Sequence, residues 1–348
     1  MILVTGGSGF IGSAFILQHL RRSDEPIANL DALTYAGNPE NLSSIEDDPR
    51  YHFIHADIRN RERLNDIFLG LKPRAVVHFA AESHVDRSIA GPDIFFQTNT
   101  LGTVNLLEAS RKLLALQNGA FLQSFRFLYV STDEVYGSLG PKDPPFTEMT
   151  PLSPRSPYSA SKASGDTACH AWGSTYGIPI LITHCSNNFG PRQFPEKLIP
   201  LMIVKILSGL PVPIYGDGLN IRDWLFVEDH CEAISTVLAK GAPGEIYNIG
   251  GNAEKTNLEI FHTVAAELRR QCPTLTSAAY QFVTDRPGHD RRYAINTEKI
   301  RRELGWSPQW TFEEGIKATV DWYLKNPVWL RHAAERAIAA SETLRNTP

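Results

Sequence analysis

The chain has 348 residues, 42% of them hydrophobic and 21% charged, with a formal net charge of -4 at pH 7. These values are typical of a globular protein with a large core, and the length favours more than one domain. The slightly acidic balance excludes an electrostatic footprint for nucleic acid or for an anionic membrane. We find no apolar run of membrane-spanning length and no secretory signal, and therefore expect a cytoplasmic protein.

Four cysteines are scattered along the chain, at Cys169, Cys185, Cys231 and Cys272. Their spacing is not that of metal ligands, and they fit reduced thiols. A catalytic cysteine is the sharper alternative, although none lies in a recognisable nucleophile context. We expect no metal site.

Short apolar runs alternate with helical patterns through the first half of the chain. Strands are predicted at residues 2–5, 27–30, 52–55, 75–78, 127–131 and 180–184, and helices at 11–20, 61–69, 98–116 and 159–176. Several of the runs are continuously apolar, as in strands that a parallel sheet buries on both faces. The pattern predicts an α/β fold, with a Rossmann-type doubly wound parallel sheet over residues 1–186.

The composition changes after about Asn187, where Pro and Gly become frequent. Further helices are predicted at residues 199–207, 229–238, 258–270 and 312–324. We interpret 187–330 as a smaller, irregular α/β region that closes over the sheet and supplies a substrate site, with the option of returning strands or helices to the first domain. The tail, 331–348, is Ala-rich and predicted to be helical; docking and fraying both remain open.

A glycine-rich loop follows the first predicted strand and opens the first helix, with Gly6, Gly9 and Gly12 around Phe10 and Ile11. Small residues permit a tight turn and a close approach of the backbone to a pyrophosphate, and the helix N-terminus offers amides to it. The loop predicts dinucleotide binding; a merely structural turn is the alternative.

Later strand ends extend this site. Asp31, at the end of the second strand, can accept hydrogen bonds from ribose hydroxyls and repels a 2′-phosphate, which favours NAD over NADP. A turn or N-cap aspartate is the alternative. Asp57 and Ile58 end the third strand, where an adenine can lie. Ala80 and Ala81 end the fourth and leave room for a cofactor.

Tyr158 and Lys162 lie four residues apart, hence on one face of the predicted helix. Lowering the phenol pKa from about 10 to about 7 takes roughly 4 kcal/mol. One cation at about 4 Å supplies about that much at an effective dielectric near 20. Lys162, with the nicotinamide's positive charge, is a sufficient source for a proton-accepting tyrosine. An ordinary exposed pair is the alternative.

Thr132, Asp133 and Glu134 follow the fifth predicted strand. Adjacent residues of a strand point to opposite faces, so both carboxylates can reach one substrate only if the backbone turns there. The segment 135–137 suggests such a turn, and solvated carboxylates at a strand end are the alternative. Thr132 can hydrogen-bond the same substrate hydroxyl as Tyr158.

The chain resembles the extended short-chain dehydrogenases/reductases and, within them, the family of dTDP-glucose 4,6-dehydratases. The resemblance rests on the glycine loop, the Tyr158/Lys162 pair and segments 31–38, 80–86, 131–137, 186–191 and 285–290. It implies bound NAD, a homodimer formed through helix 98–116 and the helix of Tyr158, and a product for deoxysugars such as rhamnose.

The resemblance also implies a mechanism and a division of roles. Tyr158 takes the C4 hydroxyl proton of dTDP-glucose while a hydride passes to NAD. Glu134 then removes the C5 proton, Asp133 protonates the leaving C6 hydroxyl, and the hydride returns to C6. Each proton step needs a positioned acid or base, in opposite protonation states at the elimination. The product is dTDP-4-keto-6-deoxyglucose.

The expected sites follow from these motifs and the resemblance. The catalytic residues are Thr132, Asp133, Glu134, Tyr158 and Lys162. The cofactor-binding residues are Gly6, Gly9, Phe10, Ile11, Gly12, Asp31, Leu33, Thr34, Asp57, Ile58, Ala80, Ala81, Ser83, Thr98, Tyr158, Lys162 and Asn188. The substrate-binding residues are Ser83, Thr132, Asn187, Lys197, Leu198, Pro213, Tyr215, Arg222, Asn257, Arg286 and His289.

Three other functions compete with this one. A UDP-sugar 4-epimerase uses the Tyr/Lys pair but has no use for an Asp/Glu acid–base pair. A GDP-mannose 4,6-dehydratase generally uses NADP, which Asp31 disfavours. A non-catalytic NAD(H)-sensing regulator is expected to lose Tyr158 or Lys162. Two departures from the family are expected in loops: an extension at 116–126, and a Pro-rich segment at 137–147 that can cover the site.

Overall fold

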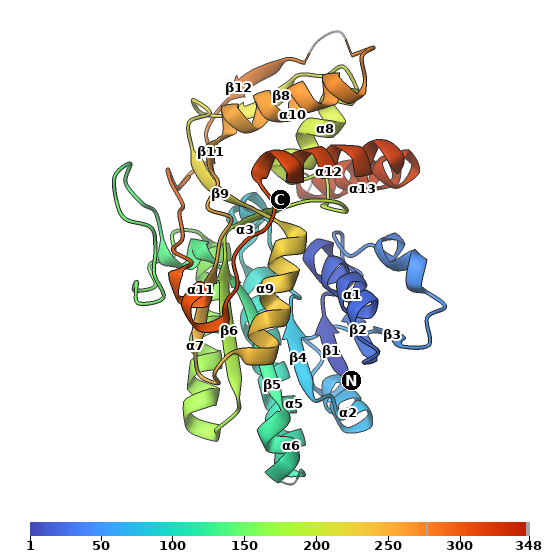
Figure 1. The fold of residues 1–348 in the computed structure, drawn as a ribbon, viewed down its shortest axis with the longest axis vertical. Coiled ribbons are helices and arrows are strands. Elements are labelled where there is room, and N and C mark those ends of the chain that lie inside the picture. The colour runs from blue at the N-terminus through green and yellow to red at the C-terminus, as the bar shows by residue number, and fades with distance from the viewer. Residues whose placement is uncertain (118, 276–277, 346–348) are drawn as a thin grey trace.

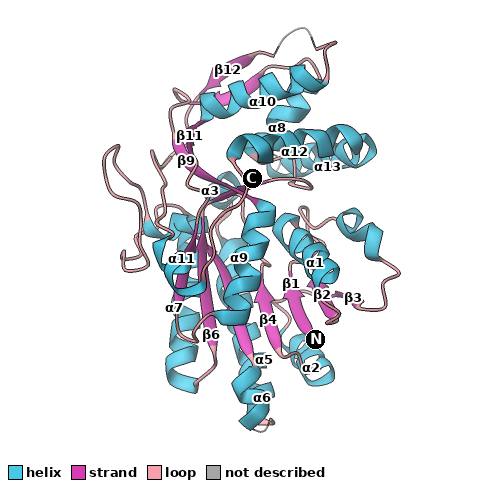
Figure 2. Cartoon of the chain, viewed as in Figure 1, coloured by secondary structure: helices cyan, strands magenta, loops and turns pink. Residues whose placement is uncertain are grey.

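A seven-stranded parallel sheet forms the centre of the larger lobe. The structure is a computed structural model that describes residues 1–117, 119–275 and 278–345. The strand order is β10-β6-β5-β4-β1-β2-β3, and every neighbouring pair is parallel. The strands are β1 (Ile2–Thr5), β2 (Ile27–Asp31), β3 (Tyr51–His55), β4 (Ala75–His78), β5 (Arg126–Thr132), β6 (Ile180–Cys185) and β10 (Ile246–Ile249). The predicted doubly wound sheet is confirmed (Figures 1 and 2).

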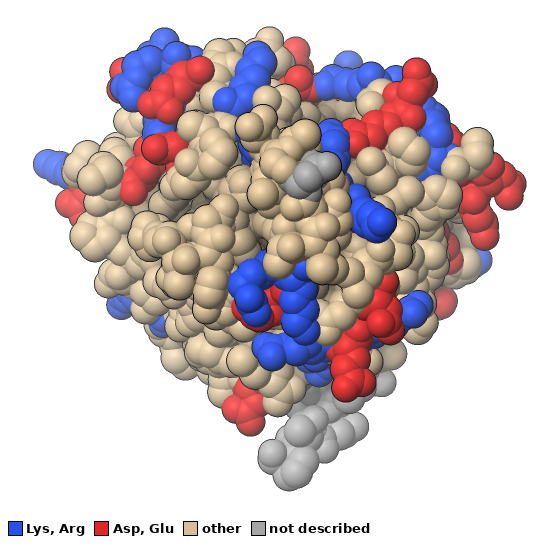
Figure 3. Space-filling model, turned by 90° about the horizontal axis from the view of Figure 1, so that it is seen from below, with Lys and Arg blue, Asp and Glu red and all other residues tan. Residues whose placement is uncertain are grey.

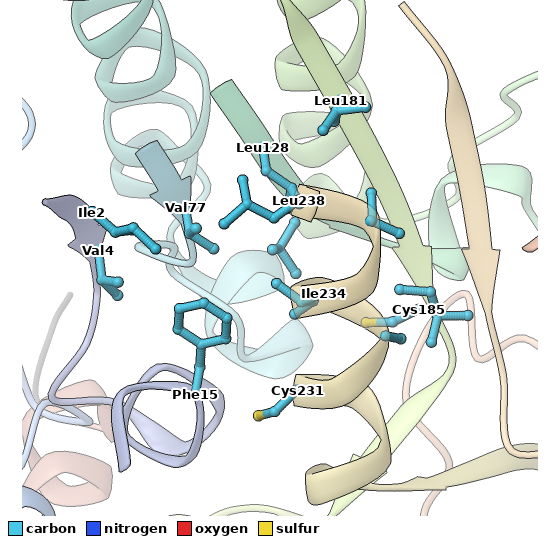
Figure 4. Close-up of a cluster of buried hydrophobic side chains, with 14 of the residues drawn as sticks. Ile2, Val4, Phe15, Val77, Leu128, Leu181, Cys185, Cys231, Ile234 and Leu238 are labelled. Atoms are coloured by element: carbon cyan, nitrogen blue, oxygen red, sulfur yellow. The ribbon is translucent and has the colours of Figure 1, made fainter. Parts of the chain in front are cut away.

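Helices cover both faces of this sheet, because alternate strand residues enter different cores. One face packs on α1 (Phe10–Arg22) and α9 (Val227–Lys240). Figure 4 shows Ile2 and Val4 of β1 beside Phe15 of α1 and Ile234 of α9. Leu3, between the two β1 residues, belongs to the opposite core. That core includes residues of α2 (Arg61–Leu71), α5 (Thr103–Ala115) and α7 (Pro157–Tyr176).

A smaller lobe lies over the carboxyl ends of the strands (Figure 1). Its strands form two sheets, β11-β9-β7 and β12-β8, and one apolar cluster joins them to the helices. The strands are β7 (Asn187–Phe189), β8 (Val212–Tyr215), β9 (Ile221–Phe226), β11 (Glu254–Thr256) and β12 (Tyr280–Val283). The helices are α8 (Leu198–Leu207), α10 (Asn257–Gln271), α12 (Phe312–Lys325) and α13 (Pro327–Arg345).

The region 187–330 contributes to both lobes. Its strand β10 pairs with β6 at the edge of the large sheet, and its helix α9 packs against α1. The short helix α11 (Glu298–Leu304) also contacts β10. The C-terminal tail is helical as far as Arg345 in α13; residues 346–348, which the predicted tail included, lie outside the described residues.

Short helices complete the chain. They are η1 (Pro39–Ile45), α3 (Val85–Ala90), α4 (Asp93–Phe95), η2 (Phe96–Gly102), α6 (Gly119–Ser124) and η3 (Asp133–Tyr136). The structure differs from the sequence predictions in three segments. The helix predicted at 98–116 begins as the π-helical η2. The loop predicted at 116–126 contains α6, with residue 118 outside the described ranges. The segment 137–147 does not line the cavity described below; Leu139 and Phe146 instead bond to the backbone of 292–294.

The end of the molecule opposite the small lobe carries charges of both signs. Figure 3 looks onto this face and shows Lys and Arg side chains beside Asp and Glu side chains. Arg74 there pairs with Glu25 near the N-terminus, with the amino group of Met1 on the same carboxylate. Within the described ranges, no helix is both long and apolar enough to cross a membrane.

Candidate active site

A cavity of about 340 Å³ opens at the carboxyl ends of the sheet strands, below the small lobe. This is the edge at which ligands enter open parallel sheets. Many of the predicted residues line it. They are Gly6, Gly9, Phe10, Ile11, Gly12, Asp31, Thr34, Asp57, Ile58, Ala80, Ala81, Ser83, Thr98, Thr132, Asp133, Glu134, Tyr158, Lys162, Asn187, Asn188 and Lys197.

The glycine loop has the shape of a phosphate cradle. Gly6 has a φ of 72°, and a Cβ there would lie 2.6 Å from the backbone nitrogen of Ala80. A Cβ on Gly12 would collide with the Gly6 carbonyl. Only glycine therefore lets the loop pass this close to β4. Gly9 is the N-cap of the 13-residue α1, and no side chain caps that end. The first turn can thus offer amides to a dinucleotide pyrophosphate.

Asp31 fixes the loop and also faces the cavity. Its carboxylate accepts hydrogen bonds from the amides of Ser8, at 2.9 Å, and Leu33, at 2.8 Å. Burial raises its pKa against the opposing effect of these two bonds. Asp31 thus makes the local contacts expected of a turn aspartate. It also lines the cavity, so its carboxylate can still bind a ribose. Leu33 has a φ of 50° and does not line the cavity.

Tyr158 lies in the first turn of α7, where local sequence fixes the helix start. Ser156 and Ser159 form a reciprocal capping box, with Pro157 in the first turn. Lys162 follows one turn later, is 3% exposed, and donates to the Val130 carbonyl at 2.8 Å. Its ammonium lies 4.1 Å from the centre of the Tyr129 ring.

The proton-accepting role of Tyr158, with positive charge from Lys162 and from the nicotinamide, stays a prediction. Burial raises the pKa of Tyr158 well above its usual value, and the nearby Glu134 charge raises it further. A hydrogen bond with Thr132 opposes this weakly. Burial also lowers the pKa of Lys162 to about 8. The side chains needed for proton transfer meet, but a phenolate requires positive charge beyond this lysine.

The backbone turns immediately after β5, so that the two carboxylates share one cavity. Asp133 and Glu134 begin η3, and the Thr132 hydroxyl accepts the Glu134 amide at 3.3 Å. Asp133 is 1% exposed, and its Oδ2 has no hydrogen-bond partner among the described residues. Its pKa is raised well above the usual value by burial and then by the Glu134 charge.

Glu134 has a different electrostatic environment. Burial raises its pKa, while the cations of Arg286, Arg222 and Lys197 oppose the rise. Asp133 therefore retains its proton to higher pH than Glu134, which suits the two carboxyl groups to opposite protonation states. The geometry brings an acid, a base and a tyrosine to one cavity.

Polar side chains of the small lobe close the cavity. Asn187 lines it with a buried Oδ1 that has no partner within the described chain. Asn188 is oriented by His230, at 2.8 Å from its Oδ1, and donates to the Ser186 carbonyl. Lys197 donates to the Ser83 carbonyl at 2.6 Å, across the two lobes.

Several predicted substrate residues lie off the cavity wall. Arg222 is 6% exposed and donates to the Asp290 carbonyl. Arg286 and Tyr215 both bind Asp86. The residues outside the wall are Leu33, Leu198, Pro213, Tyr215, Arg222, Asn257, Arg286 and His289.

Sequence reasoning missed part of the wall, notably Glu82, Gln193, Phe194 and Glu196. Glu82 lies within segment 80–86, and Glu196 is next to Lys197 in the sequence. Their closeness in sequence to predicted site residues was the signal that could have identified them. Asn99 was also missed: it binds both backbone groups of Glu82 and the Ser161 hydroxyl. Its position depends on the π-helical η2, for which the sequence has no clear signal.

Comparison with known proteins decides the family. The family model for GDP-mannose 4,6 dehydratase matches residues 3–319. The dTDP-glucose 4,6-dehydratase of Neisseria meningitidis serogroup B is 53% identical over 334 residues, 94% of either chain. The chain belongs to the dTDP-glucose 4,6-dehydratase family. The family resemblance predicted from the motifs is thereby confirmed.

Solved structures of this family and of related enzymes share the fold. DesIV, the dTDP-glucose 4,6-dehydratase of Streptomyces venezuelae solved with NAD and TYD bound, is 46% identical, with a TM-score of 0.86 over 94% of this chain and 98% of its own. A UDP-glucose 4-epimerase from Thermus thermophilus, in complex with NAD, is 31% identical with a TM-score of 0.82, over 93% and 98%. The fold is common to both activities, so the site must separate them.

Proposed function

We propose that this protein converts dTDP-glucose to dTDP-4-keto-6-deoxyglucose and water, with NAD held in the cavity. The observation that carries the proposal is the pair Asp133 and Glu134, which reaches the cavity of Tyr158 in two different electrostatic environments. The likeness to dTDP-glucose 4,6-dehydratases at about half identity supports it. A 4-epimerase would leave this pair without a task.

The residues around the glycine loop fit a dinucleotide. The uncapped first turn of α1 suits the pyrophosphate, and Asp31 suits the hydroxyls of an unphosphorylated ribose. Ala80 and Ala81 leave space beside the loop. NAD held there would supply an acceptor for the C4 hydride, the hydride for C6, and the positive charge of its oxidised ring.

Tyr158 is proposed to accept the C4 hydroxyl proton. Its contact with Thr132 would place both groups on one substrate hydroxyl. Lys162, held by the Val130 carbonyl, adds its positive charge to the same cavity. Because burial alone raises the phenol pKa, proton transfer is favoured only when further positive charge enters the cavity.

Glu134 and Asp133 are proposed to carry out the elimination. Glu134 removes the C5 proton, which the neighbouring 4-ketone has acidified. Asp133 gives its proton to the C6 hydroxyl, which leaves as water. Glu134 exchanges its proton with solvent and then delivers a proton to C5. Tyr158 releases the C4 hydroxyl proton to solvent, and Asp133 regains a proton from solvent, so the protons balance. The raised pKa of Asp133 keeps this acid protonated before the step.

The nucleotide sugar is proposed to lie between the two lobes. Ser83, Thr132 and Asn187 face the cavity and suit the hexose, and the unpartnered Asn187 oxygen is available to a hydroxyl. Arg222 and Arg286 act electrostatically on Glu134 and suit a diphosphate. The remaining proposed contacts are Lys197, Leu198, Pro213, Tyr215, Asn257 and His289.

We also propose a homodimer, a cytoplasmic location and a product used for deoxysugars such as rhamnose. Helices α5 and α7 pack side by side. Nearby apolar side chains remain uncovered: Phe96 is 39% and Leu101 57% exposed. The described cysteines are all free thiols, as suits a reducing compartment. Light scattering that gives the mass of a monomer would reject the dimer.

A product assay tests the activity. The purified protein would be incubated separately with dTDP-, UDP- and GDP-glucose and with GDP-mannose, without added reductant. We expect a 4-keto-6-deoxy product, formed fastest from dTDP-glucose. A C4 epimer, or no turnover by protein with confirmed bound NAD, would contradict the proposal. Faster turnover of GDP-mannose would reject the nucleotide assignment.

A further inference from the structure

The C-terminal helix α13 belongs to the small lobe by its packing. Trp329 is 7% exposed and lies in the apolar cluster of that lobe, with its ring 4.9 Å from Trp322 and 5.9 Å from Tyr323. Ala333, one turn later, is fully buried in the same cluster. The helix is thus anchored to a firm core.

The polar side chains of α13 reach the opposite lobe, at the cofactor end of the cavity. Arg336 donates through one guanidinium nitrogen to the Tyr35 carbonyl, at 3.0 Å, and to the Gly37 carbonyl, at 2.7 Å. Thr34, Ala36 and Gly37 line the cavity beside Asp31. One cation therefore holds two carbonyls of the backbone that forms this wall.

A second contact continues into the glycine loop. The Trp329 indole donates to the Asn41 side-chain oxygen at 2.9 Å, and the Asn41 amide donates to the Ser8 carbonyl at 3.0 Å. Asn41 is 3% exposed, so this relay is buried. Ser8 in turn gives its amide to Asp31. The indole thus supports the loop through a single intervening side chain.

A third contact between α13 and segment 34–41 lies at the surface, and an aromatic contact joins the same segment to the small lobe. His332 approaches Glu40 at 2.9 Å. Tyr35 packs edge-on against Phe194, which also lines the cavity, and its hydroxyl donates to Glu196. The segment 34–41 is therefore held between α13 and the small-lobe wall. The family model ends at residue 319, before this helix begins.

We propose that α13 is a strap that keeps segment 34–41 closed over the Asp31 end of the cavity and thereby retains NAD between turnovers. The inference rests on the proposed function, in which NAD is regenerated and need not leave. Release past this segment requires it to move, and movement breaks the bonds to Arg336 and Trp329. Arg336 is a positioning residue, since it touches the wall and acts on the cofactor through it.

The test compares two arginines of the same helix. Arg336→Ala removes the bonds to the wall, whereas Arg331→Ala changes an exposed side chain. Exchange of bound NAD against an excess of labelled NAD gives the dissociation rate without any catalytic step. We expect the rate to rise about tenfold in Arg336→Ala, as for the loss of charge-assisted hydrogen bonds. It should stay at the wild-type value in Arg331→Ala.

A kinetic readout separates retention from general damage. Arg336→Ala should lose activity on dilution and regain the wild-type kcat with added NAD, with an unchanged melting temperature. Trp329→Phe keeps an aromatic side chain and removes the N–H donor, so it replaces Arg336→Ala if that variant does not fold. NAD dissociation at the wild-type rate from a folded variant would overturn the proposed role of α13 but leave the proposed function intact. A wild-type protein that binds no NAD would instead overturn the proposed function and this inference with it.

Discussion

The two ends of the cavity are built differently. At the glycine-loop end the wall is mainly backbone, fixed by contacts so close that Gly6 and Gly12 admit no Cβ. Beyond the other end, outside the cavity wall, charged side chains hold one another: Arg286 pairs with Asp86 at 3.2 Å, and His289 with Asp285 at 2.6 Å. The first end is formed before any ligand arrives. The second would exchange ion pairs if it accepted the proposed diphosphate.

This difference predicts which substitutions change the rate of the reaction and which change substrate binding. Changes near the strand ends should alter kcat or cofactor binding, because those groups already stand in place. Changes among the paired charges should alter KM, because an exposed ion pair is worth little and is easily exchanged. The proposed catalytic side chains lie where the two ends meet.

The largest effect is expected from Tyr158→Phe, which removes the proposed proton acceptor at the meeting point. The kcat should fall by about 10³-fold, within the range of positioned acid–base catalysis. NAD content, measured after denaturation, should match that of the wild type because the strand ends are unchanged. A kcat within tenfold of the wild type would remove Tyr158 from the proposed role.

Glu134→Gln should separate the steps of the reaction. The kcat is expected to fall by about 10²-fold or more. Exchange of the C5 proton with deuterated solvent should stop, while reduction of bound cofactor by dTDP-glucose remains visible in absorbance. Undiminished C5 exchange would show that another group is the base.

Asp133→Asn should trade activity for stability. The native pKa of Asp133 is raised above its unfolded value, so the native state holds a proton that the unfolded state releases. The contribution of Asp133 to the free energy of unfolding is therefore most favourable below about pH 4, and it declines as the pH rises. We expect Asn to increase the free energy of unfolding at pH 7 by about 1–2 kcal/mol and to flatten its pH dependence.

Asp217→Asn is the matched control for this experiment. Asp217 is exposed and paired with Arg291, which holds its pKa below the usual value. Its replacement should change the free energy of unfolding at pH 7 by no more than about 0.5 kcal/mol. An Asp133→Asn protein that is less stable than the wild type at pH 7 would contradict the assigned protonation state.

The smallest effect is expected among the paired charges around Arg286. Asp86→Asn frees Arg286 and Tyr215 from a competing carboxylate. The KM for dTDP-glucose should fall about threefold, with kcat unchanged, as expected for loss of a weak, partly exposed ion pair. A raised KM with a lowered kcat would place Asp86 itself on the substrate and reverse this part of the comparison.

The same contrast explains what could be predicted from the sequence. The glycine loop, Asp31 and Ala80 follow strands, and parallel strands bring their carboxyl ends to one edge whatever the intervening loops do. The turn after β5 was also predictable, from the residues that follow Asp133 and Glu134. Local sequence sufficed wherever position along a strand determines position in the cavity.

Other features depend on contacts between distant segments. The four residues of β10 form too short an apolar run to reveal that they pair with β6 after the chain has built much of another lobe. The contacts of Arg336 with Tyr35 and Gly37 join residues about three hundred positions apart. Burial raises the pKa of Tyr158, and this effect could not be predicted from the sequence because it depends on how distant segments pack.

A substrate labelled with deuterium at C4 tests the central claim, that one temporary oxidation serves an elimination. The protein would be incubated with dTDP-[4-²H]glucose in ordinary water and the product examined by NMR and mass spectrometry. The account predicts that the deuterium appears in the C6 methyl group, with a solvent hydrogen at C5. Deuterium retained at C4, in a product with inverted C4 configuration, would show an epimerase and contradict the account.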